Sequence, residues 1–224
     1  MTGASFRQGL AVVVLALAAS AAASQAMAAG DVGVVNHLAG LVTVTNGNNT
    51  AKAQAYMNIH EGDMFEVPAG VVVKVAYFNG GRQEWFSGPT SFTIGANQSH
   101  VRRGSSPQVS VLPSGVPQKI SQTPELVQIA KLGTSSAAQG SAREPRLTPQ
   151  QQAEVRQARE IYARLRADTP PDDITPELYL YSVLQDLLLY NEMKTLVADM
   201  AKRQPGNRDV GALADYVRLK TEPK

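Results

Sequence analysis

The hydrophobic pattern changes its period part-way along the chain. Between about residues 31 and 94, short runs of β-branched and aromatic residues alternate with Gly, Asn and Pro, which is typical of an antiparallel sheet. After about residue 148, the apolar residues recur every three to four positions, as they do along one face of an α-helix. This change of period predicts an α+β fold, in which a small all-β part is followed by a helical part.

The β part is predicted to contain two hairpins. The alternating run at residues 41–45 leads into residues 46–49, Asn-Gly-Asn-Asn, which tolerate positive φ and favour a tight turn. The apolar run at residues 71–78 leads through Asn79-Gly80-Gly81 into a second strand at residues 82–86. Alternation along the apolar run predicts two faces, one with Val73, Val75 and Tyr77 and the other with Lys74, Ala76 and Phe78.

Between about residues 95 and 146 the chain is rich in Ser, Gln, Gly and Pro. Only two elements are predicted there, a strand over residues 108–112 and a short helix that begins at Thr123 and is stopped by Gly133. Residues 133–146 are then expected to form a flexible linker that contains the domain boundary.

Four helices are predicted after this linker. The first begins at residues 148–151, Thr-Pro-Gln-Gln, a pattern that favours a capping box, and the others are expected from Thr175, over 192–204 and over 209–219. The second is too apolar for a single stripe, so we expect it to be buried between its neighbours. The predicted division is a cleaved signal peptide at 1–29, a β domain at 31–115, a short helix and flexible linker at 116–147, and an α-helical hairpin domain at 148–220.

The N-terminal residues are typical of a cleavable export signal. Arg7 is the only charge before Asp31, and the apolar run at residues 10–18 is shorter than a membrane span of about 20 residues. Ala26 and Ala28 provide the small side chains that a leader peptidase accepts. We therefore expect a periplasmic protein with no membrane insertion after cleavage and, since no Cys follows the run, no lipid anchor.

Composition excludes several kinds of chemistry. The chain has no cysteine, which excludes disulfides, thiolate zinc sites and a thiol nucleophile. Without Arg7 the 21 basic residues become 20, against 19 acidic ones, so the mature net charge of +1 does not indicate a nucleic-acid partner. His37, His60 and His100 are never three or four residues apart, so we expect no metal site and no cofactor.

No catalytic signature is present, and we expect a protein that is not an enzyme. The sequence has neither a Gly-x-Ser-x-Gly elbow nor a Ser-x-x-Lys pair. Asp172 and Asp173 favour the start of the following helix, and Glu61 and Asp63 favour a turn, more readily than a pair of glycosidase acids. A catalytic triad whose members come together only in the folded chain remains an alternative.

Three short motifs stand out in the β part: residues 40–44, Gly-Leu-Val-Thr-Val; residues 61–63, Glu-Gly-Asp; and residues 71–78 running into Asn79-Gly80-Gly81. With these motifs the region 37–94 resembles the FecR-type domain, an all-β module of the bacterial periplasm. The resemblance implies a periplasmic location, contact with proteins of the envelope, and no catalytic residues. FecR-type domains usually have Asp where Asn79 stands, and similar tight turns also occur in other small β-sheet proteins.

Two sets of helical residues repeat one spacing 35 positions apart: Ala158, Tyr162, Leu165 and Pro170, and then Met193, Val197, Met200 and Pro205. This spacing resembles the second helix of a tetratricopeptide repeat, a family with a period of about 34 residues. The resemblance implies stacked helical hairpins, although Met193 stands where the family has a small residue. A plain helical bundle is the alternative.

Aromatic residues mark the candidate partner surfaces. The candidate partner-binding residues are Arg82, Trp85, Phe86, Tyr179, Tyr181 and Tyr190. Trp85 and Phe86 are neighbours on a strand and point to opposite faces, so one of them is expected to face outward, where either the chain's own helices or a partner covers it. The three tyrosines surround one helix, either as core residues or as a peptide-binding groove.

Together these features predict a non-enzymatic, exported FecR-like protein that acts as a protein-interaction or scaffold subunit of a cell-envelope complex. The alternative is a soluble sensor that relays an envelope signal to a membrane partner or a sigma-factor system. An enzyme that acts on peptidoglycan is the least favoured hypothesis.

Overall fold

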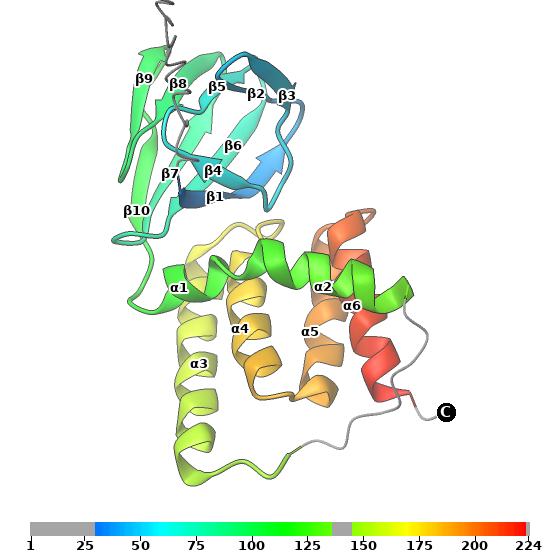
Figure 1. Ribbon diagram of the computed structural model, residues 1–224. Coiled ribbons are helices and arrows are strands. Elements are labelled where there is room, and N and C mark those ends of the chain that lie inside the picture. The colour runs from blue at the N-terminus through cyan, green and yellow to red at the C-terminus, as the bar shows by residue number, and fades with distance from the viewer. Residues whose placement is uncertain (1–29, 136–144, 223–224) are drawn as a thin grey trace, which may run out of the picture.

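The structure is a computed structural model that describes residues 30–135 and 145–222. It has three layers (Figure 1). Two β-sheets face each other, and the helices pack against the outer face of one of these sheets. The fold is therefore α+β, as the change of hydrophobic period predicts. The predicted signal peptide, and residues 136–144 of the predicted linker, lie outside the described residues.

The strands of the described residues make two antiparallel sheets. In chain order they are β1 (Asp31–Ala39), β2 (Thr43–Asn46), β3 (Asn49–Lys52), β4 (Asn58–His60), β5 (Met64–Val67), β6 (Val72–Tyr77), β7 (Arg82–Ser87), β8 (Thr90–Ile94), β9 (Ser99–Arg103) and β10 (Gln108–Val111). Sheet A has the strand order β10-β7-β6-β1-β4, and sheet B has the order β3-β2-β5-β8-β9. Sheet A is the middle layer, since the helices pack on its other face.

Both predicted hairpins are confirmed. β2 and β3 pair so that Asn46 faces Asn49, and Gly47 in the turn has a φ of 55°. β6 and β7 pair through a turn in which Gly80 and Gly81 have φ angles of 74° and 66°. These left-handed angles are the physical reason for glycine at these positions.

The space between the two sheets holds an aromatic core. Phe92 of β8 stacks on Phe86 of β7 with ring centroids 3.7 Å apart, and on Phe65 of β5 at 5.2 Å. Aliphatic side chains from both sheets complete this cluster, and each of the three rings is almost fully buried. Burial of large apolar side chains is the main stabilising term of such a sandwich.

The predicted alternation along β6 is confirmed. Val73, Val75 and Tyr77 lie in the core between the sheets. Ala76 belongs to the second core, which sheet A shares with the helices, and Phe78 packs against it. Because β6 is covered on both faces, a nearly continuous apolar run is what its position requires.

Two described elements have no clear signal in the sequence pattern. β9 is an edge strand whose side chains are mostly exposed. Its one apolar residue, Val101, is too little to give an alternating pattern. α1 (Val116–Ile120) is too short to show a helical stripe.

The remaining helices follow the predicted order. They are α2 (Thr123–Ser135), α3 (Pro149–Asp168), α4 (Thr175–Asp186), α5 (Tyr190–Arg203) and α6 (Arg208–Thr221). Every residue from Thr175 to Leu184 of α4 is buried, because α1, α3 and α5 all pack on this helix. The expectation that this helix is buried between neighbours is confirmed.

The predicted helix stop at Gly133 is wrong. α2 continues through Gly133 to Ser135 and packs along α6, where Lys131 Nζ lies 2.7 Å from Asp209 Oδ1. A Cβ atom at Gly133 would lie 3.0 Å from the ring of Tyr216, so the missing side chain admits a close helix contact. α1 and α2 thus pack in the helical layer, and the division of the chain into domains stays a prediction.

Replacing Thr148 by Ala should lower the free energy of unfolding by about 1 kcal/mol. Thr148 Oγ1 accepts from Gln151 N at 3.2 Å, and Gln151 Oε1 accepts from Thr148 N at 2.9 Å, so the predicted capping box is present at the start of α3. Equilibrium urea unfolding measures the change. The control is Thr195→Ala, at an exposed position inside α5, where Ala is the better helix former. Equal losses for both variants would contradict the capping argument.

Candidate functional site

A row of four side chains crosses the face of sheet A that meets the helices. His37 of β1 lies opposite Lys74 of β6. Trp85 of β7 lies between Lys74 and Gln108 of β10. Residues directly across neighbouring strands share a face, so the four side chains lie side by side against the helical layer.

The loop between α3 and α4 contacts this row through a buried ion pair. Lys74 Nζ lies 2.9 Å from Asp173 Oδ2, and only 9% of the Lys74 side chain and 0% of the Asp173 side chain are exposed. The second carboxylate oxygen of Asp173 accepts from Thr175 N at 2.9 Å and from Thr175 Oγ1 at 2.6 Å. Asn36 of β1 donates to the same Thr175 hydroxyl at 3.1 Å. The sheet and the start of α4 therefore share one polar network.

The same loop is also held from the helical side. Arg166 of α3 donates to the carbonyl oxygens of Thr169 and Asp173, each at 2.7 Å. Glu177 of α4 is fully buried, with Arg166 at 3.0 Å and Arg203 of α5 at 3.1 Å. These charge-assisted contacts fix the backbone of the loop.

A second contact joins the layers one residue earlier in the same loop. The Tyr56 hydroxyl donates to Gln204 Oε1 at 2.9 Å, and Gln204 Nε2 donates to the Asp172 carbonyl at 2.7 Å. Burial raises the pKa of Tyr56 well above its usual value, so the phenol keeps its proton as a donor. Asp172 itself lies 3.6 Å from His37 Nε2.

Trp85 and Phe86 point to opposite faces of sheet A, as predicted. Phe86 is 1% exposed in the core between the sheets, so it does not offer a partner surface. Trp85 is half-buried on the helical side, stacked on His37 with centroids 5.5 Å apart, and Lys74 Nζ lies 5.8 Å from its ring centroid. Trp85 is thus the outward member of the pair, partly covered by the chain's own loop.

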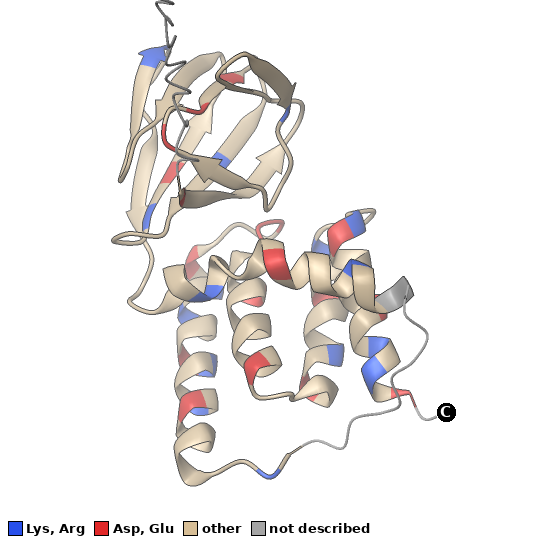
Figure 2. Cartoon of the chain, in the orientation of Figure 1, with Lys and Arg blue, Asp and Glu red and all other residues tan. Residues whose placement is uncertain are grey.

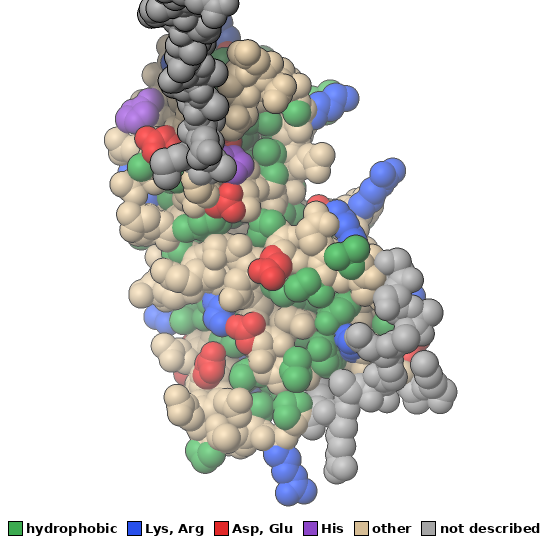
Figure 3. Space-filling model, viewed as in Figure 1, with side chains coloured by type: hydrophobic (Ala, Val, Ile, Leu, Met, Phe, Trp, Pro, Cys, Tyr) green, Lys and Arg blue, Asp and Glu red, His purple; other side chains and the backbone are tan. Residues whose placement is uncertain are grey.

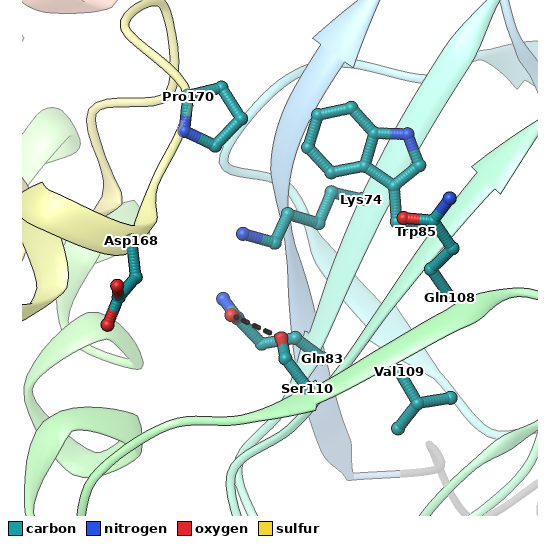
Figure 4. A pocket seen from close by; sticks show the side chains of 8 residues that line it. All are labelled: Lys74, Gln83, Trp85, Gln108, Val109, Ser110, Asp168 and Pro170. Carbon is teal, nitrogen blue, oxygen red and sulfur yellow. Dashed lines mark hydrogen bonds between the residues drawn. The ribbon is translucent and has the colours of Figure 1, made fainter.

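Beside Trp85 is a cavity of about 340 Å³, which we name the junction pocket. Its lining residues come from the sheet and from the end of α3 with the following loop: Lys74, Gln83, Trp85, Gln108, Val109, Ser110, Asp168 and Pro170. Figure 4 shows Lys74 and Gln83 pointing from the sheet toward the side occupied by Asp168 and Pro170. The pocket therefore combines an aromatic ring, an ammonium group, two amide side chains, a hydroxyl group and a carboxylate.

Gln83 is the unusual member of the junction pocket. It is 5% exposed, its Oε1 accepts from Ser110 Oγ at 3.3 Å, and its buried Nε2 has no hydrogen-bond partner among the described residues. A buried amide donor without a partner is unfavourable by about 1–3 kcal/mol, so such groups are rare unless something else satisfies them.

The structure places Arg82 away from this site. Residues two apart on a strand share a face, so Arg82 lies with Glu84 and Phe86 rather than with Trp85. Its Nε is 2.6 Å from Oε1 of the fully buried Glu84, whose other oxygen accepts from Ser99 N at 3.0 Å. Arg82, a candidate partner-binding residue, therefore does not share a surface with Trp85.

The three candidate tyrosines lie in the core of the helical layer. Tyr179, Tyr181 and Tyr190 are 5%, 1% and 5% exposed. Burial raises the pKa of Tyr190 to about 12, and its ring meets that of Tyr216 edge to face at 6.2 Å. Their role is packing, which is one of the two roles that the sequence leaves open, and they do not meet Trp85.

Strand β10 forms the open edge of sheet A next to the pocket. No described strand pairs with its outer side. All four of its residues are exposed, and Val109 and Val111 are 47% and 69% exposed. Two exposed valines on an open edge make this strand the second part of the candidate site.

Some site residues have a sequence signal that points to them. Lys74 is the single charge in a run of apolar residues, and such a charge requires a buried partner. Gln83 has the same parity as Trp85 on its strand and therefore shares its face. Asp168 has no signal, because it reaches the pocket only through the packing of α3 on the sheet.

The rest of the described surface offers less for a specific site. Figure 2 shows basic and acidic side chains mixed along the helices, and Figure 3 shows apolar side chains interspersed with polar ones over the helical part of that face. Within residues 30–135 and 145–222, no three His, Cys, Asp or Glu side chains gather as metal ligands. No helix in these ranges is both long enough and apolar enough to cross a membrane.

No family model, curated protein or solved structure matches this chain.

Proposed function

We propose that this protein is a non-enzymatic, exported interaction subunit that binds an extended segment of a cell-envelope protein along the outer edge of β10. One observation carries the proposal: β10 is an open, uncharged edge with two exposed valines. The expected export signal and the resemblance to periplasmic FecR-type domains support the envelope location.

The other sheet edges carry the charges that normally prevent strand addition. β9 ends with Arg102 and Arg103, and β3 ends with Lys52. β4 is only three residues long and includes His60. Charged or very short edge strands discourage pairing with other chains, whereas β10 has neither a charge nor a cover. The contrast favours β10 as an edge kept open for a partner.

The backbone of β10 is oriented for strand addition. Leu112 N donates to Gly81 O of the β7 side at 2.8 Å. Antiparallel pairing alternates, so Ser110 and Gln108 also face β7, and the backbone groups of Val109 and Val111 face outward. A partner strand that pairs there gains main-chain hydrogen bonds, and its apolar side chains cover the two valines.

The finer family assignment belongs to the same proposal. The Glu61-Gly62-Asp63 turn leads into β5, and Asn79-Gly80-Gly81 joins β6 to β7, so two of the motifs that carry the FecR resemblance lie at turns between strands. α4 and α5 pack on each other, and Met193 and Met200 are fully buried. These contacts support a tetratricopeptide-like helical hairpin.

Val111→Lys should reduce the recovery of the envelope partner at least about tenfold, because a charge on an edge strand opposes strand addition. The measurement is in-cell crosslinking of the full chain, followed by purification and quantitative mass spectrometry. Leu41→Lys is the matched control, since Leu41 is 68% exposed against 69% for Val111 and lies before β2.

The proposal is supported only by a partner that is still recovered with Leu41→Lys and is no longer recovered with Val111→Lys. A partner lost equally with both variants, or with neither, contradicts it. Crosslinks found only between copies of this chain would contradict it as well, because they would assign β10 to self-association.

A further inference from the structure

We propose that the junction pocket is a binding site for a neutral sugar ring. The proposal goes beyond the interaction through β10 and does not depend on it. It starts from Gln83, a residue of the pocket wall that is 5% exposed and whose buried Nε2 has no hydrogen-bond partner within the described part of the chain. A ligand with an acceptor oxygen supplies what this donor lacks.

The charges of the pocket select a neutral ligand. Lys74 is neutralised by Asp173 at 2.9 Å, so its ammonium group is a hydrogen-bond donor rather than a net positive charge. Asp168 adds a carboxylate on the opposite wall. A carboxylate or phosphate ligand would be repelled by Asp168, whereas a hydroxyl group accepts from Gln83 and donates to Asp168.

The size and lining of the pocket suit a small ring-shaped ligand. A volume of about 340 Å³ is at the small end of ligand sites, about 300–1,000 Å³, and holds one or two pyranose rings. The indole of Trp85 provides an apolar surface for the C–H face of such a ring, and Pro170 adds apolar contact. A sugar ring has an apolar C–H face and polar hydroxyl groups at its rim, and the pocket offers an aromatic surface together with hydrogen-bonding side chains.

The walls of the pocket are held in place before any ligand arrives. The Lys74–Asp173 pair fixes the sheet against the loop, and Arg166 holds the loop carbonyls of Thr169 and Asp173. His37 stacks on Trp85 and orients its ring. A site that is already ordered loses little conformational entropy on binding, which favours a small ligand.

Titration of the full-length mature protein, followed by tryptophan fluorescence, tests the proposal directly. Trp85 is the only tryptophan of the chain, so its emission reports on this pocket alone. The probes are maltotriose, cellotriose and chitotriose, with trigalacturonic acid as the anionic comparison. We expect at least one neutral trisaccharide to shift the emission saturably to shorter wavelength, because a stacked ring displaces water from the indole, and the anionic probe to bind more weakly.

Three variants locate the site. Gln83→Leu removes the buried donor and Asp168→Asn removes the carboxylate, and each should weaken binding about tenfold. Asp199→Asn, on the surface of α5, should bind like the wild type. Val111→Lys should also bind normally, which separates the sugar site from the β10 edge. Urea unfolding of each variant verifies that it is folded at the titration temperature.

Two outcomes overturn the proposal. One is the absence of a saturable change with every neutral trisaccharide. The other is binding whose strength is the same in Gln83→Leu and Asp168→Asn as in the wild type, because the sugar then lies elsewhere.

Discussion

Asp173→Ala should lower the free energy of unfolding by about 3–5 kcal/mol, the range measured when one member of a buried ion pair is removed. The substitution leaves the Lys74 ammonium group, 9% exposed, without its anionic partner at 2.9 Å. It also removes the acceptor of two hydrogen bonds from Thr175 at the start of α4. The change is measured by urea unfolding, as a lower midpoint at an unchanged slope.

Asp172→Ala is the matched control, one residue away in the same loop. The Asp172 side chain is 58% exposed and lies 3.6 Å from His37, so its removal should change the free energy of unfolding by less than about 1 kcal/mol. The double variant Lys74→Met with Asp173→Ala should recover part of the loss, since no unpaired charge is then buried. Equal effects of Asp173→Ala and Asp172→Ala would contradict the importance of the buried pair.

Phe86→Ala should also lower the free energy of unfolding by about 3–5 kcal/mol, because it opens a cavity in the core between the sheets. Phe86 is 1% exposed and stacks on Phe92 at 3.7 Å. Trp85→Ala should cost only about 1–2 kcal/mol, since Trp85 is half-buried at the rim of the junction pocket. Urea unfolding followed by far-UV circular dichroism measures both, because Trp85→Ala removes the fluorescent residue.

The two losses of unfolding free energy distinguish a core side chain from one at the surface. A loss for Trp85→Ala as large as that for Phe86→Ala would mean that Trp85 is a core residue and that the pocket is closed in solution. A small loss for Phe86→Ala would contradict the stacked aromatic core. Neither result depends on the identity of any ligand.

The sequence predicts well those parts of the fold that local residues determine. The hairpin turns at Gly47 and at Gly80 and Gly81 are visible because left-handed backbone angles require glycine or asparagine. The capping box at Thr148 is visible because its two partners are three residues apart. The opposite faces of Trp85 and Phe86 follow from the pleat alone.

The candidate site is harder to predict, because it is assembled from distant segments. Lys74 and Asp173 are 99 residues apart, and Tyr56 and Gln204 are 148 apart, so no local pattern joins them. The junction pocket exists only because α3 ends over β7 and β10. Arg82 differs from these residues, since the period of two along its strand is enough to place it on the face opposite to Trp85.

The helical layer takes its helices from both sides of residues 136–144: α2 precedes this segment and packs on α6, which follows it. A chain divided within that segment would therefore yield two complementary pieces. The first piece carries α2, which packs on α6 and α4 of the second, and the second lacks the helix that covers α6. The native contact between α2 and α6 is therefore the surface through which two such pieces would rejoin when they are produced together.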